Sequence, residues 1–194
     1  MSLATAPLVL FVSVVVLQTP AANQSPPADF KVEILGEVVA DFSARMTAYA
    51  NLRRRLEDGL TPLRVTDDPS EITRAETALA ERIRLAREGS RRGEIFTPKI
   101  RAAFRQILRA ETNAGRCASI LDDNPGEFSY RLNGTYPKIQ PLSTVPPGIL
   151  TVLPRLPADV QYRFLSRDLI LHDSRANVIL DRIDQAIRCP RELQ

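Results

Sequence analysis

The spacing of apolar residues changes once along this chain, and that change constrains the fold more than any other feature. Between about residues 29 and 111, apolar residues recur every three or four positions, as on one face of a helix. From residue 112 onward the spacing falls towards two, as in strands. Helices followed by strands are typical of an α+β protein. We therefore expect one folded unit with a helical region over residues 29–111 and a Pro-rich segment with a small sheet over residues 112–194.

The first helix that the sequence predicts is long. It runs from about residue 29 to residue 58 and stops at Gly59, a residue type that commonly ends helices. Its apolar residues follow a 3.6-residue period, so they form a stripe that must pack against another element. The stripe consists of Leu35, Val38, Val39, Phe42, Met46, Tyr49, Leu52 and Leu56.

Two further helices follow. The second begins at Asp68, which can cap it, with Pro69 in the first turn and Glu71 at the capping-box position. Small alanines on its inward face permit close approach, so we expect an antiparallel helical hairpin with the first helix across residues 59–67. The third begins at Thr97. The inward face of the second helix contains Ile72, Ala75, Leu79, Ile83 and Ala86, and that of the third contains Ile100, Phe104, Ile107 and Leu108.

The C-terminal segment predicts a three-stranded antiparallel β-meander. Its strands are expected at about 161–165, 168–172 and 177–181, with turns at Ser166-Arg167 and at residues 173–176. A sheet of this size is marginal alone, so one face must pack on the helices.

The middle of the chain predicts a hairpin and an extended connection. Asn133-Gly134 is a strong hairpin-turn signal, flanked by possible strands at 128–132 and 135–139. Pro137 would confine the second of these strands to a sheet edge. Six prolines fall between Pro137 and Pro157, which favours an extended, structured segment leading into the meander.

The N-terminus predicts export. The first 28 residues carry no charge, and residues 8–17 form an apolar run. That run is shorter than the about 20 residues of a membrane span but suits a secretory signal peptide. Cleavage after Ala21 would give a signal peptide of residues 1–21 and a linker of residues 22–28. Since no Lys or Arg precedes the run, an uncleaved membrane anchor formed by residues 7–22 is the alternative.

The charge balance does not favour nucleic acid as a partner. The chain has 26 basic and 23 acidic side chains, a formal net charge of +3, which attracts polyanions only weakly. The run Arg53-Arg54-Arg55 lies next to Glu57 and Asp58, so a solvated helix face is favoured over an anion site.

Motifs for known chemistry are missing from the sequence. It contains no HExxH, CxxC, GxSxG or Gly-rich phosphate loop. The single histidine, His172, lies beside Asp173 and near Asp168 and Asp181, which makes it a weak candidate for a metal ligand or general base; a strand-end residue is the alternative. We therefore assign no catalytic, cofactor-binding or metal residue and no cofactor.

Three other groups have a functional and a structural interpretation. Asp67-Asp68 and Asp122-Asp123 could be acid/base pairs, but a helix cap and a turn explain them better. Four aromatic residues could line a groove for a sugar or peptide, although core packing is their commoner use in strands. These are Tyr130, Tyr136, Tyr162 and Phe164.

The two cysteines, Cys117 and Cys189, can form a disulfide in an oxidising compartment. Free thiols are the alternative. Neither cysteine lies in a CxxC pair, and no cluster of histidines completes a zinc site.

Four segments in order resemble an uncharacterised family of exported bacterial proteins that ends in a YRF, RDLIL, D, AN, I, D pattern. The segments are FTPKIRAAFRQIL, LNGTYP, VPPGILTVLPRLP and VQYRFLSRDLILHDSRANVILDRIDQAI, and the resemblance covers about residues 70–187. It implies a signal peptide, a helical front half, a short terminal sheet and a bacterial envelope or secreted setting. It implies no activity and no catalytic residues. Glycine is common in that pattern where Ser166 stands here, and the cysteines lie outside it.

Together these features predict a non-catalytic binding or assembly protein of the bacterial periplasm or cell exterior. Its partner would be a protein or an envelope component, and its N-terminal helices could support self-association. The alternative is an envelope enzyme whose site the sequence does not reveal. A membrane would be involved only if the N-terminal segment is not cleaved.

The export hypothesis makes a direct prediction about the mature protein. Mass spectrometry of the chain purified from the envelope fraction is expected to find Ala22 at the N-terminus, because Thr19 and Ala21 are small enough for signal peptidase. An intact Met1 would instead identify the anchored form.

Overall fold

The structure is a computed structural model that describes residues 28–62, 64–123, 129–136 and 145–189. It contains α1 (Ala28–Glu57), α2 (Pro69–Ala86), α3 (Pro98–Glu111), α4 (Ala114–Asp122), α5 (Pro147–Leu150), β1 (Val160–Leu165), β2 (Asp168–Asp173) and β3 (Val178–Ile183). The α+β class with a C-terminal meander is confirmed. The predicted signal peptide of residues 1–21 and nearly all of the linker lie outside the described residues. Among the helices that are described, none has the length and apolar character needed to cross a bilayer.

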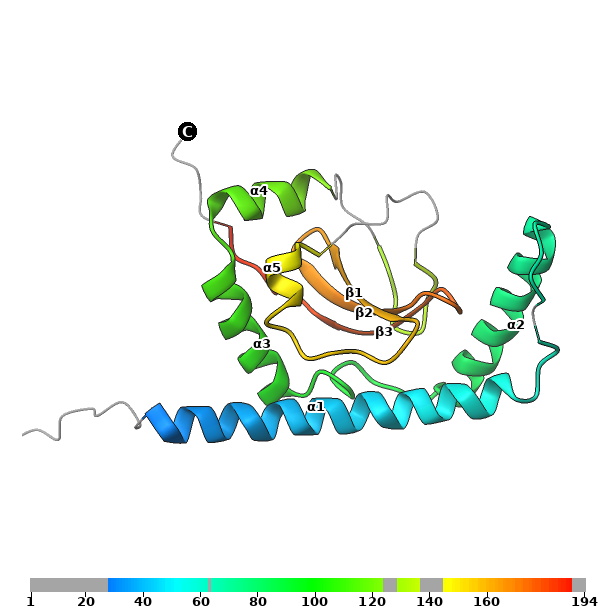
Figure 1. Cartoon of the computed structure of the whole chain (residues 1–194), viewed down its shortest axis with the longest axis horizontal. Coiled ribbons are helices and arrows are strands. Elements are labelled where there is room, and N and C mark those ends of the chain that lie inside the picture. Colours follow the sequence, from blue (N-terminus) through cyan, green and yellow to red (C-terminus); the bar gives the residue numbers. More distant parts are fainter. Residues whose placement is uncertain (1–27, 63, 124–128, 137–144, 190–194) are drawn as a thin grey trace, which may run out of the picture.

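Helix α1 forms the base of the molecule. α3 rises from the N-terminal half of α1, α2 rises near its C-terminal end, and the sheet lies between them (Figure 1). The helix spans Ala28–Glu57, as the apolar period predicted, and its stripe faces the core except at Leu35, which is 41% exposed. Val38, Phe42, Met46 and Tyr49 are buried in that stripe. The long helix therefore supplies one continuous apolar surface on which the other elements pack.

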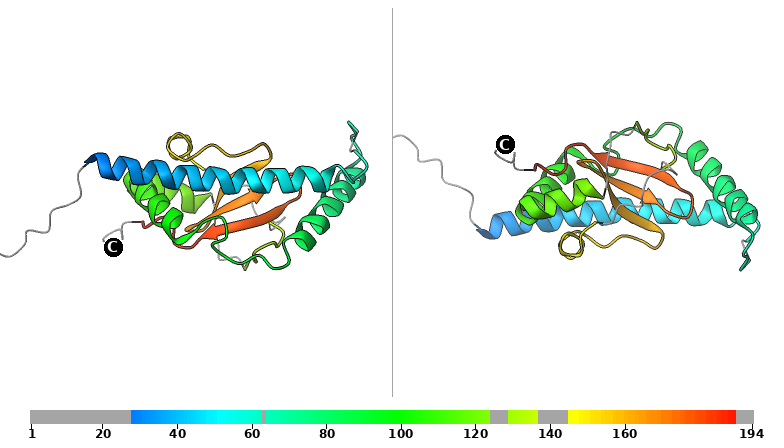
Figure 2. Two further views of the ribbon diagram at one scale, coloured as in Figure 1. Left: turned by 90° about the horizontal axis from the view of Figure 1, so that it is seen from below. Right: turned by 90° about the horizontal axis from the view of Figure 1, so that it is seen from above.

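Helices α1 and α2 meet at one corner and then diverge as an open V, so the expected hairpin is wide instead of closely packed (Figure 2). The corner is fixed by Arg82, whose guanidinium donates to the carbonyls of Leu56 (3.0 Å) and Gly59 (2.7 Å). Asp68 caps α2 as predicted, accepting from the Ser70 N–H at 2.8 Å. Helix α2 enters the core through Leu79, Ala80 and Ile83 in its C-terminal half. Two residues that we expected to face inward do not: Ile72 is 45% exposed, and Ala86 is exposed.

The sheet has the strand order β1-β2-β3 with antiparallel pairing, and all three strands match the prediction to within two residues. Its pairing shifts once. His172 opposes Ile179 and Leu171 opposes Asp181, so Leu180 is the extra residue of a β-bulge. A bulged residue is released from the ladder, and the Leu180 carbonyl accepts instead from Arg87 Nη2 at 3.0 Å.

Helices and strands share one core. The inner face of the sheet packs on α1, α3, α4 and α5, and four aromatic rings join these layers. Phe42, Phe96, Phe104 and Tyr162 have neighbouring ring centroids 5.1 to 6.3 Å apart. Such aromatic pairs stabilise a core beyond their buried area. A smaller cluster covers the outer face and consists of Tyr136, Leu165, Ile170 and Ile179, with Tyr130 against it.

The middle of the chain differs from the prediction. Residues 114–122 form a helix that was not expected, and the Asn113 side chain caps it by accepting from the Arg116 N–H at 2.8 Å. The Pro-rich segment contains α5, a single helical turn. Residues 137–144 of that segment lie outside the described part.

The predicted hairpin around Asn133-Gly134 is wrong over the residues described, 129–136. The chain does turn there, and Asn133 adopts a left-handed conformation with φ 56°. Its flanks do not pair with each other, however. The Asn133 N–H donates to the Ile179 carbonyl (2.8 Å), and the Ile179 N–H donates to the Gly134 carbonyl (2.9 Å). The segment therefore runs along the edge of β3.

Cys117 in α4 and Cys189 after the sheet form a disulfide, with Cα atoms 5.5 Å apart. Cys117 is buried in the core. The bond fixes the C-terminal segment that follows β3 onto α4, so it connects the last part of the chain to the helical layer.

Replacing both cysteines by serine is expected to lower the free energy of unfolding by about 4 kcal/mol, because the bond closes a loop across a sequence separation of 72 residues. Urea unfolding followed by circular dichroism measures this loss. Dithiothreitol should destabilise the unaltered protein by a similar amount and leave the double variant unchanged. Equal unfolding midpoints for the two proteins would contradict a disulfide in solution.

Candidate functional site

His172 lies on the outer face of the sheet and is 3% exposed. Its Nε2 lies 3.0 Å from Asn177 Oδ1, its ring packs 5.0 Å from that of Tyr136, and its Nδ1 has no hydrogen-bond partner among the described residues. Burial lowers the pKa of this imidazole, an effect that the hydrogen bond to Asn177 partly opposes. The histidine is therefore held neutral within a packed layer.

Asp173, the neighbour of His172, faces the other way and is fully buried. One carboxylate oxygen accepts from the Tyr49 hydroxyl at 2.6 Å, and the other accepts from the backbone N–H groups of Arg175 and Ala176 at 3.1 and 2.9 Å. Burial and the charge of Asp173 both raise the pKa of Tyr49. This carboxylate joins the β2–β3 turn to α1.

Asp181 is also fully buried, and it binds backbone amides. Its carboxylate accepts from the N–H groups of Gly93 (3.1 Å), Ile95 (2.9 Å) and Phe96 (2.8 Å) in the loop between α2 and α3. Three such bonds satisfy a buried charge without any ligand.

The acidic residues near His172 in sequence thus do not form a site with it. Asp168 accepts from the Tyr130 hydroxyl (2.5 Å) and the Gln185 N–H (2.8 Å), so it also holds the sheet together. Within the described ranges, no three His, Cys, Asp or Glu side chains lie close enough to hold a metal ion.

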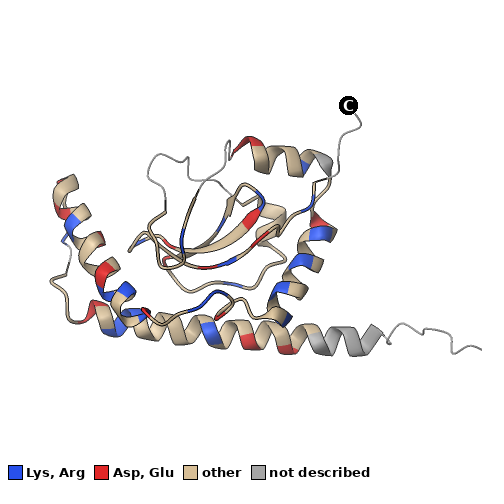
Figure 3. Ribbon diagram, turned by 180° about the vertical axis from the view of Figure 1, so that it is seen from behind, with Lys and Arg blue, Asp and Glu red and all other residues tan. Residues whose placement is uncertain are grey.

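The arginine run at the end of α1 is divided between two environments. Arg53 turns inward, where Nη1 lies 2.9 Å from Asp159 Oδ2 and Nε lies 3.9 Å from Asp173 Oδ2. Arg54 and Arg55 are exposed. Basic and acidic residues are interleaved along the described part of α1, as Figure 3 shows. The predicted solvated face therefore applies to two of the three arginines, and Arg53 is an anchor for the start of β1.

The predicted acidic pairs have positions at helix ends. Asp68 is the N-cap of α2, while Asp122 and Asp123 lie at the C-terminal end of α4. All four residues of the two pairs are exposed or partly exposed.

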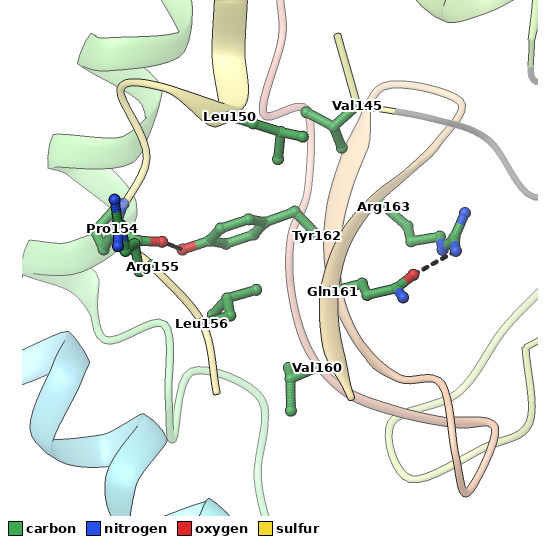
Figure 4. Close-up of a pocket in the computed structure, with 9 residues that line it drawn as sticks. All are labelled: Val145, Leu150, Pro154, Arg155, Leu156, Val160, Gln161, Tyr162 and Arg163. Carbon is green, nitrogen blue, oxygen red and sulfur yellow. Dashed lines mark hydrogen bonds between the residues drawn. The ribbon is translucent and has the colours of Figure 1, made fainter. Parts of the chain in front are cut away.

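A hollow lies beside β1, and we call it the β1 groove (Figure 4). It has a volume of about 500 Å³. One wall is β1, and the other is the chain from α5 to the start of that strand. Its lining consists of Val145, Leu150, Pro154, Arg155, Leu156, Val160, Gln161, Tyr162 and Arg163.

The Tyr162 side chain connects the two walls of the groove. It projects from β1 across the hollow, and its hydroxyl donates to the Pro154 carbonyl at 3.0 Å (Figure 4). Burial raises the pKa of this tyrosine, so the hydroxyl stays protonated as a donor. This hydrogen bond thus fixes the wall segment relative to the strand.

Four consecutive residues of β1, from Val160 to Arg163, line the groove. Successive side chains of a strand point to opposite faces of the sheet. A hollow that touches all four must therefore lie along the edge of the strand, and β1 is an outer strand of the sheet. The groove combines apolar side chains with backbone polar groups and two arginines, a composition suited to binding.

The four aromatic residues follow the core-packing interpretation that their place in strands favoured. Tyr162 and Phe164 are buried in the inner cluster, Tyr136 is buried in the outer cluster, and Tyr130 packs against the outer cluster. Tyr162 also lines the β1 groove. Sequence reasoning missed Leu150 and Arg155. Only the position of β1 at the sheet edge opens a groove beside them.

Comparison of the chain with protein-family models, curated proteins and solved structures finds no match.

The burial of His172 predicts a pH dependence of stability. Because the folded pKa lies below the unfolded value of about 6.5, the unfolded chain binds a proton first as the pH falls. Stability contributed by neutral His172 is complete above about pH 6.5 and is lost as the pH falls towards the folded pKa.

His172→Gln is expected to weaken the fall in stability between pH 7 and pH 5, as measured by urea unfolding at both values. The chain has one histidine, so a single imidazole signal reports its titration by NMR. A folded pKa at or above 6.5 would contradict the predicted sign.

Proposed function

We propose that this chain is a non-catalytic binding or assembly protein of the bacterial periplasm or cell exterior and that the β1 groove is its binding surface. The observation that carries the proposal is the groove itself, an apolar hollow along an outer strand with Arg155 and Arg163 at its sides. Shallow apolar hollows of this kind are typical of partner recognition.

The polar groups that catalysis would need have structural partners instead. The carboxylates of Asp173 and Asp181 accept backbone and tyrosine hydrogen bonds, and neither residue lines the β1 groove. This arrangement favours binding over chemistry at the groove.

Two observations support the exported setting. A disulfide is stable in an oxidising compartment such as the periplasm, and Cys117–Cys189 is formed. The uncharged N-terminal run has the composition of a signal peptide. The resemblance to exported bacterial proteins agrees with both.

Site-specific photo-crosslinking in cells that export the chain tests the proposal. Val152 lies next to the groove and is 42% exposed, so a benzoylphenylalanine placed there is expected to capture the partner. The matched control is Leu85 on α2, which is 75% exposed and lies outside the groove lining.

A second variant links the adduct to the groove. Leu150→Trp should fill the hollow and abolish the adduct at position 152, while circular dichroism confirms the fold. Adducts of the same kind at both positions, or no adduct at position 152, would count against the groove as the binding surface. An adduct of twice the chain mass would identify self-association.

A further inference from the structure

A second hollow lies at β3, the other outer strand of the sheet, and we call it the β3 pocket. It has a volume of about 230 Å³. Sites for drug-sized ligands have about 300–1,000 Å³, so this pocket suits a smaller molecule. Three arginines line it together with apolar side chains, and these residues are Arg92, Arg131, Arg182, Tyr130, Leu132 and Ile179.

The three arginines of the pocket come from parts of the chain that are far apart in sequence. Arg92 belongs to the loop between α2 and α3, Arg131 to the segment before the turn at Asn133, and Arg182 to β3. The backbone bonds of Asn133 to β3 fix the second segment, and the carboxylate of Asp181 fixes the loop. The contacts that determine the fold therefore also hold three guanidinium groups around one hollow.

These arginines outnumber the carboxylates beside them. Arg92 and Arg182 both pair with Asp184, whose Oδ1 lies 2.9 Å from Arg182 Nε. The other acidic residue is Asp181, which also lines the pocket but is fully buried and accepts from backbone N–H groups. Three guanidinium groups thus face two carboxylates, which leaves a surplus of positive charge at the pocket.

Arg131 supplies unused hydrogen-bond donors. Its side chain is exposed and has no hydrogen bond or ion pair with another residue in the described part of the chain. A guanidinium group carries five N–H donors and can bind a phosphate group through two parallel hydrogen bonds. The pocket therefore offers a charged donor that no neighbouring carboxylate satisfies.

An apolar surface lies next to the arginines. The Arg182 guanidinium carbon is 5.0 Å from the centre of the Tyr130 ring, a cation–π contact that fixes this arginine. The Tyr130 hydroxyl donates to Asp168 at 2.5 Å, so the ring and not the hydroxyl is available to a ligand. Leu132 adds aliphatic atoms to the same lining. A ligand of this pocket therefore needs an apolar part as well as an anionic group.

We propose that the β3 pocket binds a small organic phosphate. Its phosphate group would accept from Arg92, Arg131 and Arg182. Its organic part would lie against Tyr130 and Leu132. A phosphate monoester has three acceptor oxygens and up to two negative charges, which suits three arginines better than the two oxygens and single charge of a carboxylate. The proposal goes beyond the proposed function, because it concerns a second site that takes a small molecule.

Isothermal titration calorimetry of the purified, disulfide-bonded protein with defined probes tests the proposal. The main probe is phenyl phosphate, which joins a phosphate group to an apolar ring. Inorganic phosphate offers the anion alone, benzyl alcohol offers the ring without charge, and benzoate replaces the phosphate group by a carboxylate. All titrations use the same pH and low ionic strength, because salt screens the attraction between exposed charges.

Phenyl phosphate is expected to bind at least about tenfold more tightly than each of the other probes, because each lacks either the ring or the charged acceptors of the phosphate group. Equal binding of benzyl alcohol would overturn the role of the arginines, and equal binding of inorganic phosphate would overturn the apolar contact. Equal or tighter binding of benzoate would overturn the preference for phosphate. No binding of phenyl phosphate at up to about 10 mM would overturn the site.

A charge exchange locates the contact. Arg131→Glu is expected to weaken the binding of phenyl phosphate by at least about tenfold, since it removes a donor and adds a like charge. Arg109→Glu, on the exposed side of α3 and outside the pocket lining, makes the same change in net charge. It should weaken binding by less than about twofold, because the charge at a distance is screened. Equal losses in both variants would overturn a specific contact at Arg131.

NMR of the unaltered protein gives a readout that does not depend on a variant folding. Phenyl phosphate is expected to shift the backbone amide signals of residues 130–132 and of Arg182. Shifts that fall only outside the pocket lining would overturn the β3 pocket. The β1 groove is tested separately by the adduct at position 152, so either site can fail while the other stands.

Discussion

The buried carboxylate of Asp181 is the interaction on which the placement of the helices around the sheet depends. It lies on β3 and accepts three backbone hydrogen bonds from the loop that joins α2 to α3. A buried charge without partners would be very unfavourable, so the loop must stay where its amides reach the carboxylate. That position packs Phe96 against Phe42 and Phe104 in the core. The sheet and the three long helices are thereby held in one arrangement.

Other polar residues of the C-terminal segment have the same kind of role. Asp173 joins the β2–β3 turn to Tyr49 of α1, and Asn177 contacts His172 across the strands. The β-bulge at Leu180 frees a carbonyl for Arg87, which also binds Asn133. The residues that give this segment its distinctive pattern thus satisfy folding requirements. Because their hydrogen-bonding groups are occupied inside the protein, we place the proposed binding surface at the β1 groove instead.

The two outer strands of the sheet have different neighbours. Residues 133–136 run along β3 and bond to it, while on the side of β1 the Tyr162 hydroxyl connects the strand to Pro154 in the opposite wall of the groove. The same buried tyrosine belongs to the aromatic core, so it connects the packing of the core to the proposed binding surface.

The sequence by itself determined the elements whose pattern is local. The stripe from Val38 to Tyr49, the cap at Asp68 and the alternation in the meander define α1, α2 and the three strands, because helical and strand periods depend on neighbours in the chain. Only the tertiary structure decided which elements meet. Asn133-Gly134 specifies a turn but not the strand that pairs with it, which is β3 in the structure. Cys117 and Ile120 are buried, and their role as the inward face of α4 became evident only from the core that they enter. The groove depends on β1 being an outer strand, which is a property of strand order and of contacts between residues far apart in the sequence.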